Sequence, residues 1–287
     1  MTSAHGKLGA PETPETPGAS PGGGAGNRSK FGPKRERVRL LNVDVDDITM
    51  DELVESFDEG LMMTLHVDMI MKLQKDREFF EIVPQFDVVT CDSQILYGAS
   101  KLLGTPIRER VSGSDYFPRF CAKYKDDPSI TVFLCGGGPG IAEIARKNVN
   151  AKLGREMVVG TDSPPFDYDR REGEVDRMVE RIHASRASVL IVGLGAGRQE
   201  KFIVQNRARL PHVRMFLPLG GTIDYEAGTL QRPASWVTDV GLEWLYRLGR
   251  EPRQRWRRYL VHQPPVLWHL ARQRLGLYRN PFESARA

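Results

Sequence analysis

Short apolar segments alternate with segments of helical periodicity from about Val38 to Leu217, and this alternation restricts the fold more than any other feature. Strands that alternate with helices of about 10 to 15 residues indicate parallel βαβ units with helices on both faces of a sheet. The sequence therefore predicts an α/β protein with a mostly parallel sheet that is complete by about Gly221. The expected strands cover residues 38–43, 62–65, 86–90, 129–134, 157–160, 189–192 and 213–217.

Helical spacing of apolar residues follows most of the expected strands. Thr49 and Glu52 fit a capping box, which predicts a helix from this point to about Leu61. A second helix is expected to end near Lys75, and Gly220 to Asp224 are expected to form a loop after the last strand. The remaining expected helices cover residues 95–103, 115–123, 141–153, 175–185 and 199–210.

Composition divides the chain into three parts. Residues 1–36 contain eight glycines and five prolines. Such a segment offers too little apolar surface to offset the entropy lost on ordering, so it is expected to be a disordered tail. Residues 37–240 form the expected α/β domain. Residues 241–287 are expected to be a helical basic appendage, broken at Pro252 and at Pro264-Pro265.

The appendage carries most of the charge asymmetry. Six arginines lie between Arg247 and Arg258 against one acid, Glu251, and four aromatic residues are interleaved with them. Such a pattern suits phosphates or anionic lipid headgroups. Nucleic acid is the weaker partner, because the basic residues are confined to one end and no recognition motif accompanies them.

The three cysteines show no paired metal-ligand spacing, and Cys91 and Cys135 are expected to be small buried side chains in a reducing compartment. The histidines form no legible metal site. The sequence shows neither a signal-peptide pattern nor an apolar run of ~18 residues. We therefore expect a cytoplasmic protein without a cofactor or a metal.

Asp92 is the first candidate for chemistry. It follows an expected strand and precedes an expected helix, and in open α/β sheets ligands bind outside the carboxyl ends of the strands. A carboxylate there can remove a proton from a substrate hydroxyl. The alternative is a helix N-cap, because Asp accepts hydrogen bonds from the first backbone N–H groups of a helix.

Further loops follow other strands. Gly136-Gly137-Gly138-Pro139-Gly140 suits a phosphate at a helix start, or a tight turn. Gly193 to Gly197 resembles a dinucleotide-binding loop but lacks the third glycine at the required spacing. A loop that contains Gly220, Gly221 and Asp224 is expected to follow the last strand. The segment 108–115 offers Arg108 and Arg110 for bidentate phosphate contact, or forms a solvated loop with a helix cap.

Several of these segments together resemble the WecG/TagA/CpsF glycosyltransferases, over roughly residues 38–261. Their order and spacing are specific although each segment alone is weak. They are Thr64-Leu65-His66, Thr90-Cys91-Asp92-Ser93, the segment 108–115, Leu194-Gly195-Ala196-Gly197-Arg198-Gln199-Glu200-Lys201, Gly220-Gly221-Thr222-Ile223-Asp224, and 241–248 with Glu251-Pro252-Arg253.

The resemblance implies a Rossmann-like fold of the GT-E type and places the family's functional residues on this chain. The essential carboxylate falls on Asp92, and a threonine facing the same pocket falls on Thr64. A site arginine falls on Arg110 and a site glutamine on Gln199. The other expected substrate-binding residues are Asp115, Gly136, Gly137, Gly220, Gly221 and Asp224, with Arg247, Arg253 and Arg257 from the appendage.

The family's activity implies an inverting transfer of a sugar, often N-acetylmannosamine, from a UDP donor to a polyprenyl-diphosphate-linked saccharide, without an obligatory metal. The appendage would hold the enzyme at the anionic inner face of the plasma membrane, and a homo-oligomer is compatible with it. Three positions depart from the family pattern. His66 replaces the usual asparagine, Ser93 the usual glycine and Gly197 the usual proline.

Two other functions remain alternatives on the sequence. A non-catalytic α/β adaptor, held at a membrane by its basic end, is compatible with the departures at His66 and Ser93. A nucleotide-dependent oxidoreductase is suggested only by the loop at Gly193.

Overall fold

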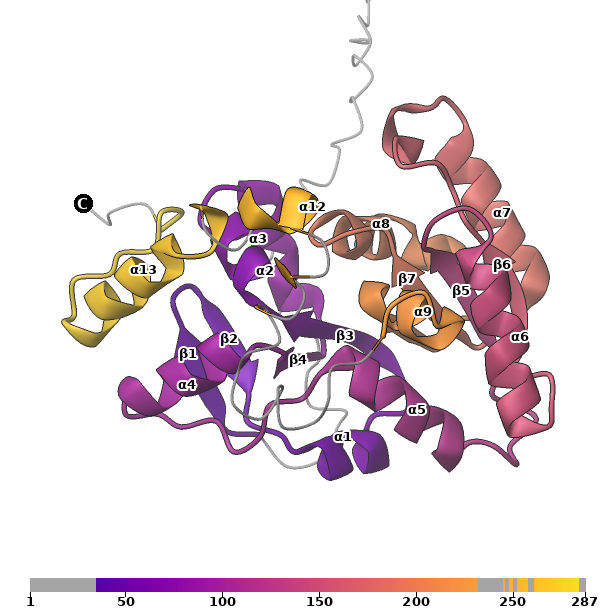
Figure 1. Ribbon diagram of the computed structural model, residues 1–287, viewed down its shortest axis with the longest axis horizontal. Coiled ribbons are helices and arrows are strands. Elements are labelled where there is room, and N and C mark those ends of the chain that lie inside the picture. The colour runs from indigo at the N-terminus through magenta and orange to yellow at the C-terminus, as the bar shows by residue number, and fades with distance from the viewer. Residues whose placement is uncertain (1–34, 232–244, 246–247, 250–251, 258–260, 284–287) are drawn as a thin grey trace, which may run out of the picture.

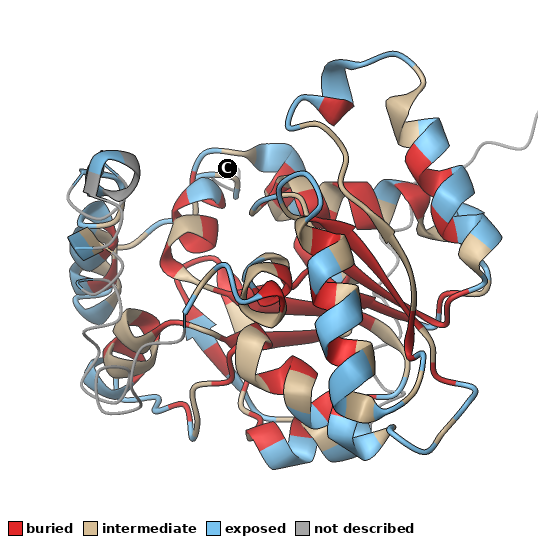
Figure 2. Cartoon of the chain, turned by 45° about the vertical axis from the view of Figure 1, so that its right-hand side comes forward, coloured by how far each residue is buried: buried red, intermediate tan, exposed pale blue. Residues whose placement is uncertain are grey.

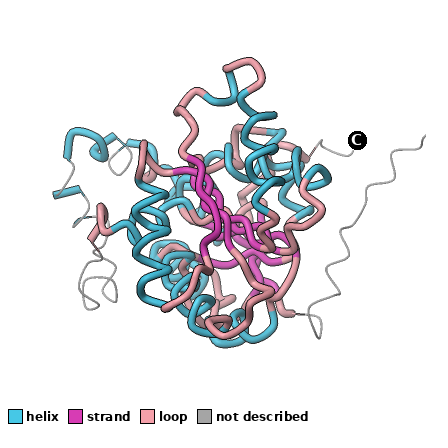
Figure 3. Tube along the Cα trace, turned by 90° about the vertical axis from the view of Figure 1, so that its right-hand side faces the viewer, coloured by secondary structure: helices cyan, strands magenta, loops and turns pink. Residues whose placement is uncertain are grey.

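The centre of the protein is a six-stranded parallel sheet in the order β4-β3-β8-β7-β5-β6. The computed structural model describes residues 35–231, 245, 248–249, 252–257 and 261–283. Helices cover both faces of the sheet (Figure 1, Figure 3), so the predicted α/β fold with a mostly parallel sheet is confirmed. The strands of this sheet are β3 (Gly60–Leu65), β4 (Val88–Cys91), β5 (Val132–Gly136), β6 (Val158–Asp162), β7 (Val189–Gly193) and β8 (Met215–Leu217).

The inner strands are buried on both faces (Figure 2). Along β7, Leu190 and Val192 belong to one apolar core, while Val189 and Ile191 belong to the core on the opposite face. Because successive side chains of a strand point to opposite faces, a sheet covered by helices on both sides needs uninterrupted apolar runs. This requirement explains why the strand segments were recognisable in the sequence.

Two layers of helices supply the two cores. The first core receives side chains from α1 (Met50–Ser56), α5 (Gly113–Lys123), α6 (Ile141–Leu153) and α9 (Gly220–Ala227). The second receives them from α2 (Val67–Lys72), α3 (Arg77–Ile82), α4 (Gln94–Leu102), α7 (Glu174–Ser185), α8 (Arg198–Asn206) and α13 (Pro265–Arg274). Short 3-10 helices lie at Val83–Gln85, Tyr168–Arg170 and Arg207–Arg209.

The single strand expected over residues 38–43 is wrong. The chain forms instead an antiparallel hairpin of β1 (Arg37–Leu40) and β2 (Val43–Asp46), outside the main sheet. The turn places Leu41 at a φ of 53°, an uncommon conformation for a residue other than glycine. Tertiary contacts hold it there, because the Leu41 N–H donates to Gln273 Oε1 and the buried Asn42 amide donates to the Leu73 carbonyl.

Several predicted boundaries also need correction. The helix that begins at the Thr49 capping box ends at Ser56 rather than near Leu61, because the buried Phe57 turns the backbone into an extended conformation. The helix expected to end near Lys75 is α2, which ends at Lys72. The helix α3 was not predicted, and Asp76 caps it by accepting from the Phe79 N–H. The segment from Gly220 to Asp224 is not a loop but the start of α9.

The C-terminal segment packs against the α/β core. Residues 1–34 of the expected tail and the proposed domain boundary at Gly241 lie outside the described residues. Helices α12 (Pro252–Arg257) and α13 both begin at proline, which is compatible with the first turn of a helix. Val266 and Leu270 of α13 are buried in the core beside α2. In the described part of the chain, no helix has the length and hydropathy needed to cross a bilayer.

Replacement of Leu270 by alanine should test this packing. Leu270 is 6% exposed and Leu267, on the same helix, is 60% exposed. We expect Leu270→Ala to lower the free energy of unfolding by about 2 to 4 kcal/mol, through lost burial and the cavity left behind. The matched Leu267→Ala should change it by less than about 0.5 kcal/mol. Chemical denaturation measures both, and equal effects would show that α13 is not seated in the core.

Candidate active site

Asp92 follows β4 directly and does not cap the next helix. The N-cap of α4 is Ser93, whose hydroxyl accepts from the Leu96 N–H at 3.4 Å, so the N-cap interpretation of Asp92 is wrong. The Asp92 carboxylate is 26% exposed. Its Oδ1 lies 3.4 Å from Arg110 Nη1, and its Oδ2 accepts from the Gly113 N–H at 3.4 Å. Because it is partly exposed, the carboxylate is open to a ligand that approaches the sheet edge and could accept a proton from it.

Arg110 lies between two carboxylates at the start of α5. Its Nη1 faces Asp92 and its Nη2 lies 3.8 Å from Asp115 Oδ2, while its own side chain is 17% exposed. Ser112 is the N-cap of α5, and its hydroxyl accepts from the Asp115 N–H at 3.3 Å. The structure therefore brings Asp92, Arg110 and Asp115 together, as the sequence predicted for one site.

Gly113 lies between Asp92, the predicted site residue Thr64, and Leu219 in the loop after β8. A Cβ atom on Gly113 would lie 2.5 Å from Leu219 Cδ2 and 3.5 Å from Thr64 Cγ2. Thr64 is 7% exposed on β3 and pairs with Thr90 of β4. Because Gly113 also donates to Asp92, a larger residue there would push into the pocket that the sequence assigned to Thr64 and Asp92.

Three glycines, Gly220, Gly193 and Gly136, pack closely against one another along the carboxyl edge of the sheet, between Leu219 and β5. A Cβ atom on Gly193 would lie 3.1 Å from Gly220 Cα, and one on Gly136 would lie 2.3 Å from the Gly193 carbonyl oxygen. Gly137, at a φ of 74°, donates its N–H to that same carbonyl at 3.3 Å. Tight backbone packing thus explains Gly136 and Gly137, and it places the N-termini of α6 and α9 at the carboxyl edge. Both helix starts are suited to an anionic group.

Gln199, on α8, lies against Gly220, one of these closely packed glycines. Its side chain is 6% exposed, and its carbonyl oxygen lies 3.2 Å from where a Cβ atom on Gly220 would stand. Its Nε2 donates to the Pro218 carbonyl at 3.0 Å and to Glu200 Oε1 at 2.8 Å. Burial raises the pKa of the fully enclosed Glu200 to about 7. Sequence reasoning assigned no role to Glu200 or Gly113, although both lie inside the segments that carry the family resemblance.

The other predicted residues take different positions. Gly221 is exposed in the first turn of α9, and the Asp224 carbonyl accepts from the N–H groups of Thr229 and Leu230 at the end of that helix. Arg253 and Arg257 are exposed on α12, where the Arg257 guanidinium lies over the Trp256 ring. No described contact joins these arginines to Asp92. Arg247 lies outside the described residues.

The C-terminal segment nevertheless reaches the neighbourhood of the site. Gln263 donates to Asp68 Oδ1 at 3.0 Å, and Asp68 Oδ2 lies 3.9 Å from His66 Nδ1. His66 follows β3 just as Asp92 follows β4, and the Asp92 N–H donates to the Leu65 carbonyl between them. The segment after α12 thus contacts α2 next to the carboxyl end of β3.

The cysteine beside Asp92 is not a nucleophile. Cys91 and Cys135 are buried, as predicted, and so is Cys121. Burial raises the pKa of Cys91 to about 12, so its thiol stays protonated near neutral pH.

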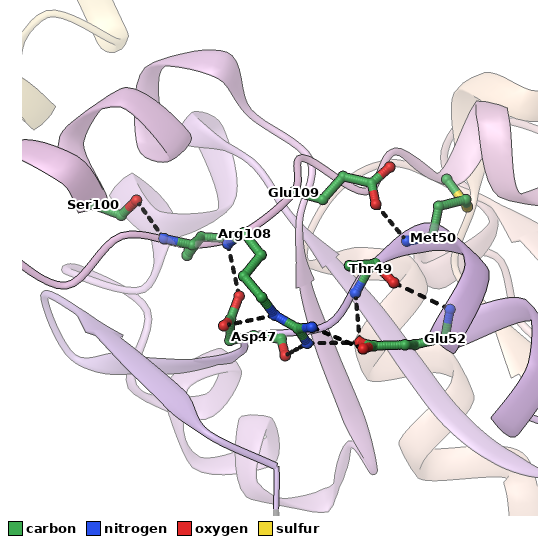
Figure 4. A network of polar contacts seen from close by, with 8 residues as sticks. Asp47, Thr49, Met50, Glu52, Ser100, Arg108 and Glu109 are labelled. Carbon is green, nitrogen blue, oxygen red and sulfur yellow. Dashed lines mark hydrogen bonds and ion pairs between the residues drawn. The ribbon is translucent and has the colours of Figure 1, made fainter.

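The loop that carries Arg110 is fastened to α1 by Arg108 (Figure 4). The Arg108 guanidinium donates to Asp47 Oδ2 at 3.0 Å and to both oxygens of Glu52, while its backbone N–H donates to Asp47 Oδ1. The neighbouring Glu109 accepts from the Met50 N–H at 2.9 Å. Residues 108 and 109 therefore point to α1, and Arg110 turns to Asp92.

The hydrogen bonds from Arg108 lower the pKa of Glu52 to about 2. Since this value lies below the ordinary 4.5, the stability contributed by ionised Glu52 is fully present above about pH 4.5 and is lost as the pH falls through 2. The contact between Arg108 and Glu52 is thus intact throughout the neutral range.

Removal of Arg108 should therefore weaken the site more than the fold. We expect Arg108→Ala to lower ligand affinity and turnover by about tenfold, because the loop no longer holds Arg110 against Asp92, with little change in thermal stability. Arg119→Ala is the control, since Arg119 forms an exposed ion pair with Asp51 of α1 outside this loop. Equal kinetics for both variants would contradict the role of Arg108.

A comparison with protein families agrees with this geometry. The model of the glycosyl transferase WecG/TagA/CpsF family matches residues 38–280, a range that includes the α/β core, α12 and α13. Members of this family transfer sugars in the synthesis of cell-surface polysaccharides, so the oxidoreductase alternative suggested by the loop at Gly193 is wrong. This chain belongs to the WecG/TagA/CpsF family of glycosyltransferases.

Proposed function

We propose that this protein is an inverting glycosyltransferase that uses Asp92 as its catalytic base. The supporting observation is the Asp92 carboxylate itself, which lies at the carboxyl end of β4, is not the N-cap of α4 and is partly exposed beside Arg110. The donor is a UDP-sugar that carries N-acetylmannosamine or another hexose. The acceptor is a polyprenyl-diphosphate-linked saccharide.

The reaction exchanges one bond to the anomeric carbon for another. Asp92 removes the proton from the acceptor hydroxyl, and the resulting oxygen attacks the anomeric carbon from the face opposite the leaving group. The bond from that carbon to the UDP oxygen breaks, the electron pair leaves with UDP, and the configuration inverts. A well-placed general base contributes about 10² to 10⁴ to the rate.

The leaving diphosphate needs positive charge and hydrogen-bond donors. Arg110 and the starts of α6 and α9, at Gly136–Gly140 and Gly220–Gly221, lie along the edge of the sheet and are assigned this role in place of a metal ion. Thr64 and Asp115 complete the pocket, and Asp224 lies further along α9. Arg247, Arg253 and Arg257 are assigned to the diphosphates from the appendage.

The first experiment compares UDP release by the wild type and Asp92→Asn with UDP-N-acetylmannosamine, UDP-glucose, UDP-N-acetylglucosamine and UDP-glucuronate. The acceptor is a lipid-diphosphate-linked disaccharide. We expect acceptor-dependent release with one donor, reduced at least about 10²-fold in the variant because the base is lost. Asp126→Asn is the control, since that carboxylate is 87% exposed and remote in the fold. Unchanged turnover in Asp92→Asn would remove Asp92 from this role, and silence of the wild type across the donors would favour the adaptor.

We further propose that the C-terminal segment holds the enzyme at the anionic inner face of the plasma membrane. Leu267, Trp268, Leu275 and Leu277 are each at least 59% exposed. The last three line an apolar hollow of about 470 Å³ together with Arg272 and Arg279. Apolar side chains with arginines around them are typical of a surface that lies in the headgroup region of a membrane.

Vesicle binding tests this attachment. We expect the double variant Trp268→Ser/Leu275→Ser to bind phosphatidylserine vesicles at least about tenfold more weakly than the wild type, because buried apolar area drives interfacial binding. High salt should weaken the wild type as well, since arginines contribute about 1 kcal/mol each near an anionic surface. Leu102→Ser is the control, as Leu102 is 77% exposed on α4. Equal binding by all three proteins would place the membrane contact elsewhere.

A further inference from the structure

His66 occupies the N-cap position of α2, but its side chain makes no capping hydrogen bond. The neighbouring helices α1, α3, α4 and α5 all begin with a side-chain oxygen as cap, supplied by Thr49, Asp76, Ser93 and Ser112. Asparagine, the usual residue of the family at position 66, is also a favourable N-cap. A residue that gives up capping at the carboxyl edge of the sheet is expected to have another use.

The imidazole ring of His66 turns one nitrogen toward Asp68 of α2. Its Nδ1 atom is buried and lies 3.9 Å from Asp68 Oδ2, while the side chain as a whole is 28% exposed. The exposed part of the side chain therefore lies away from Nδ1, and the ring edge on that side carries Nε2. Because His66 follows β3 and Asp92 follows the neighbouring β4, both side chains belong to the same end of the sheet.

The C-terminal segment holds the carboxylate of Asp68. Its Oδ1 accepts from Gln263 Nε2 at 3.0 Å, which leaves Oδ2 on the side of His66. Gln263 stands just before α13, and Val266 and Leu270 of that helix are buried in the core beside α2. The packing of α13 therefore fixes the donor that holds Asp68.

The charge of Asp68 favours one of the two neutral forms of His66. An ionised carboxylate only accepts hydrogen bonds, so it stabilises the form of the ring that carries its proton on Nδ1. Nε2 then keeps its lone pair and acts as a hydrogen-bond acceptor. Such an acceptor suits a hydroxyl group of a sugar and does not suit a phosphate oxygen, which has no proton to donate.

We propose that Asp68 is a positioning residue that sets the orientation and the protonated nitrogen of His66, and that Gln263 holds Asp68 for this purpose. On the proposed function, on which this inference rests, His66 Nε2 accepts a hydrogen bond from a hydroxyl group of a bound sugar. The C-terminal segment thus acts on the site through two successive contacts, and Gln263 itself does not touch the ligand.

Nuclear magnetic resonance of the ring nitrogens of His66 tests the inference in the ligand-free protein. At about pH 9, above the ordinary histidine pKa of about 6.5, we expect wild-type His66 to carry its proton on Nδ1. In Asp68→Asn, the amide keeps its oxygen toward Gln263 and turns its NH₂ group to His66, so the proton should move to Nε2. A wild-type ring protonated on Nε2, or the same protonated nitrogen in both proteins, would overturn the inference.

Two further variants separate the contact of Gln263 from the packing of the C-terminal segment in general. Gln263→Ala removes the donor that holds Asp68, so the carboxylate can rotate and the preference of His66 for a proton on Nδ1 should fall. Tyr278→Phe is the matched control. It removes a hydrogen bond of 2.6 Å to Gln74 Oε1, beyond the other end of α2, and should leave the His66 signals unchanged. Equal responses of His66 to both variants would contradict the role of Gln263.

Steady-state kinetics then tests whether Asp68 acts through His66. We expect Asp68→Asn to raise the KM for one substrate by about three- to tenfold, as for one lost hydrogen bond, and to change kcat by less than about twofold. A higher KM for the UDP-sugar places the recognised hydroxyl on the donor, and a higher KM for the lipid-linked disaccharide places it on the acceptor. Because Asp68 acts through His66, Asp68→Asn should have no further effect in a His66→Ala background.

Unchanged KM values in Asp68→Asn, or additive effects of the two substitutions, would refute the positioning role. A wild type that turns over none of the donors would refute the proposed donor instead. The nitrogen signals of His66 would then still decide the role of Asp68, because they are measured without a ligand.

Discussion

The close approach of three glycine backbones is the constraint on which the site depends. Gly136 and Gly193 end neighbouring strands, and a side chain on Gly136 would collide with the Gly193 carbonyl. Gly193 in turn touches Gly220, so α9 can begin directly against the end of β7. Since α9 starts there, the preceding Leu219 reaches Gly113 and closes the row toward Asp92. Larger residues in this row would separate the strand ends from the helix starts that face them.

The groups assigned to chemistry are held by residues that take no part in it. Arg108 fastens the loop of Arg110 to α1, and Glu200 fixes the amide of Gln199 (Figure 4 shows the first of these). The two devices differ physically. The contacts of Arg108 are exposed and bidentate, so they depend on geometry. Glu200 is buried, and this burial raises the pKa of its carboxyl to about 7. A site at the open edge of a sheet needs such support, because loops alone hold side chains poorly.

Prediction from sequence succeeded where burial forces a regular pattern. The strands of the main sheet are apolar on both faces, as the run Val189 to Val192 illustrates, and such runs are visible without coordinates. It failed where distant contacts decide the backbone. Leu41 turns the chain into a hairpin because its N–H meets Gln273 of α13, and no local pattern contains that information. Likewise, the N-cap interpretation of Asp92 was locally reasonable, and only the structure gave that role to Ser93.

The sequence by itself determined the fold class and the family, because motif spacing and strand alternation are properties of the chain order. The tertiary structure decided which of the predicted site residues meet. It joined Asp92 to Arg110 across 18 positions and to Gly113 across 21, brought Asp115 beside Arg110, and placed Glu200 where water is excluded. It also packed Val266 and Leu270 of α13 into the core. Burial and long-range contact arise only when the chain closes on itself, so these properties could not be read from local patterns.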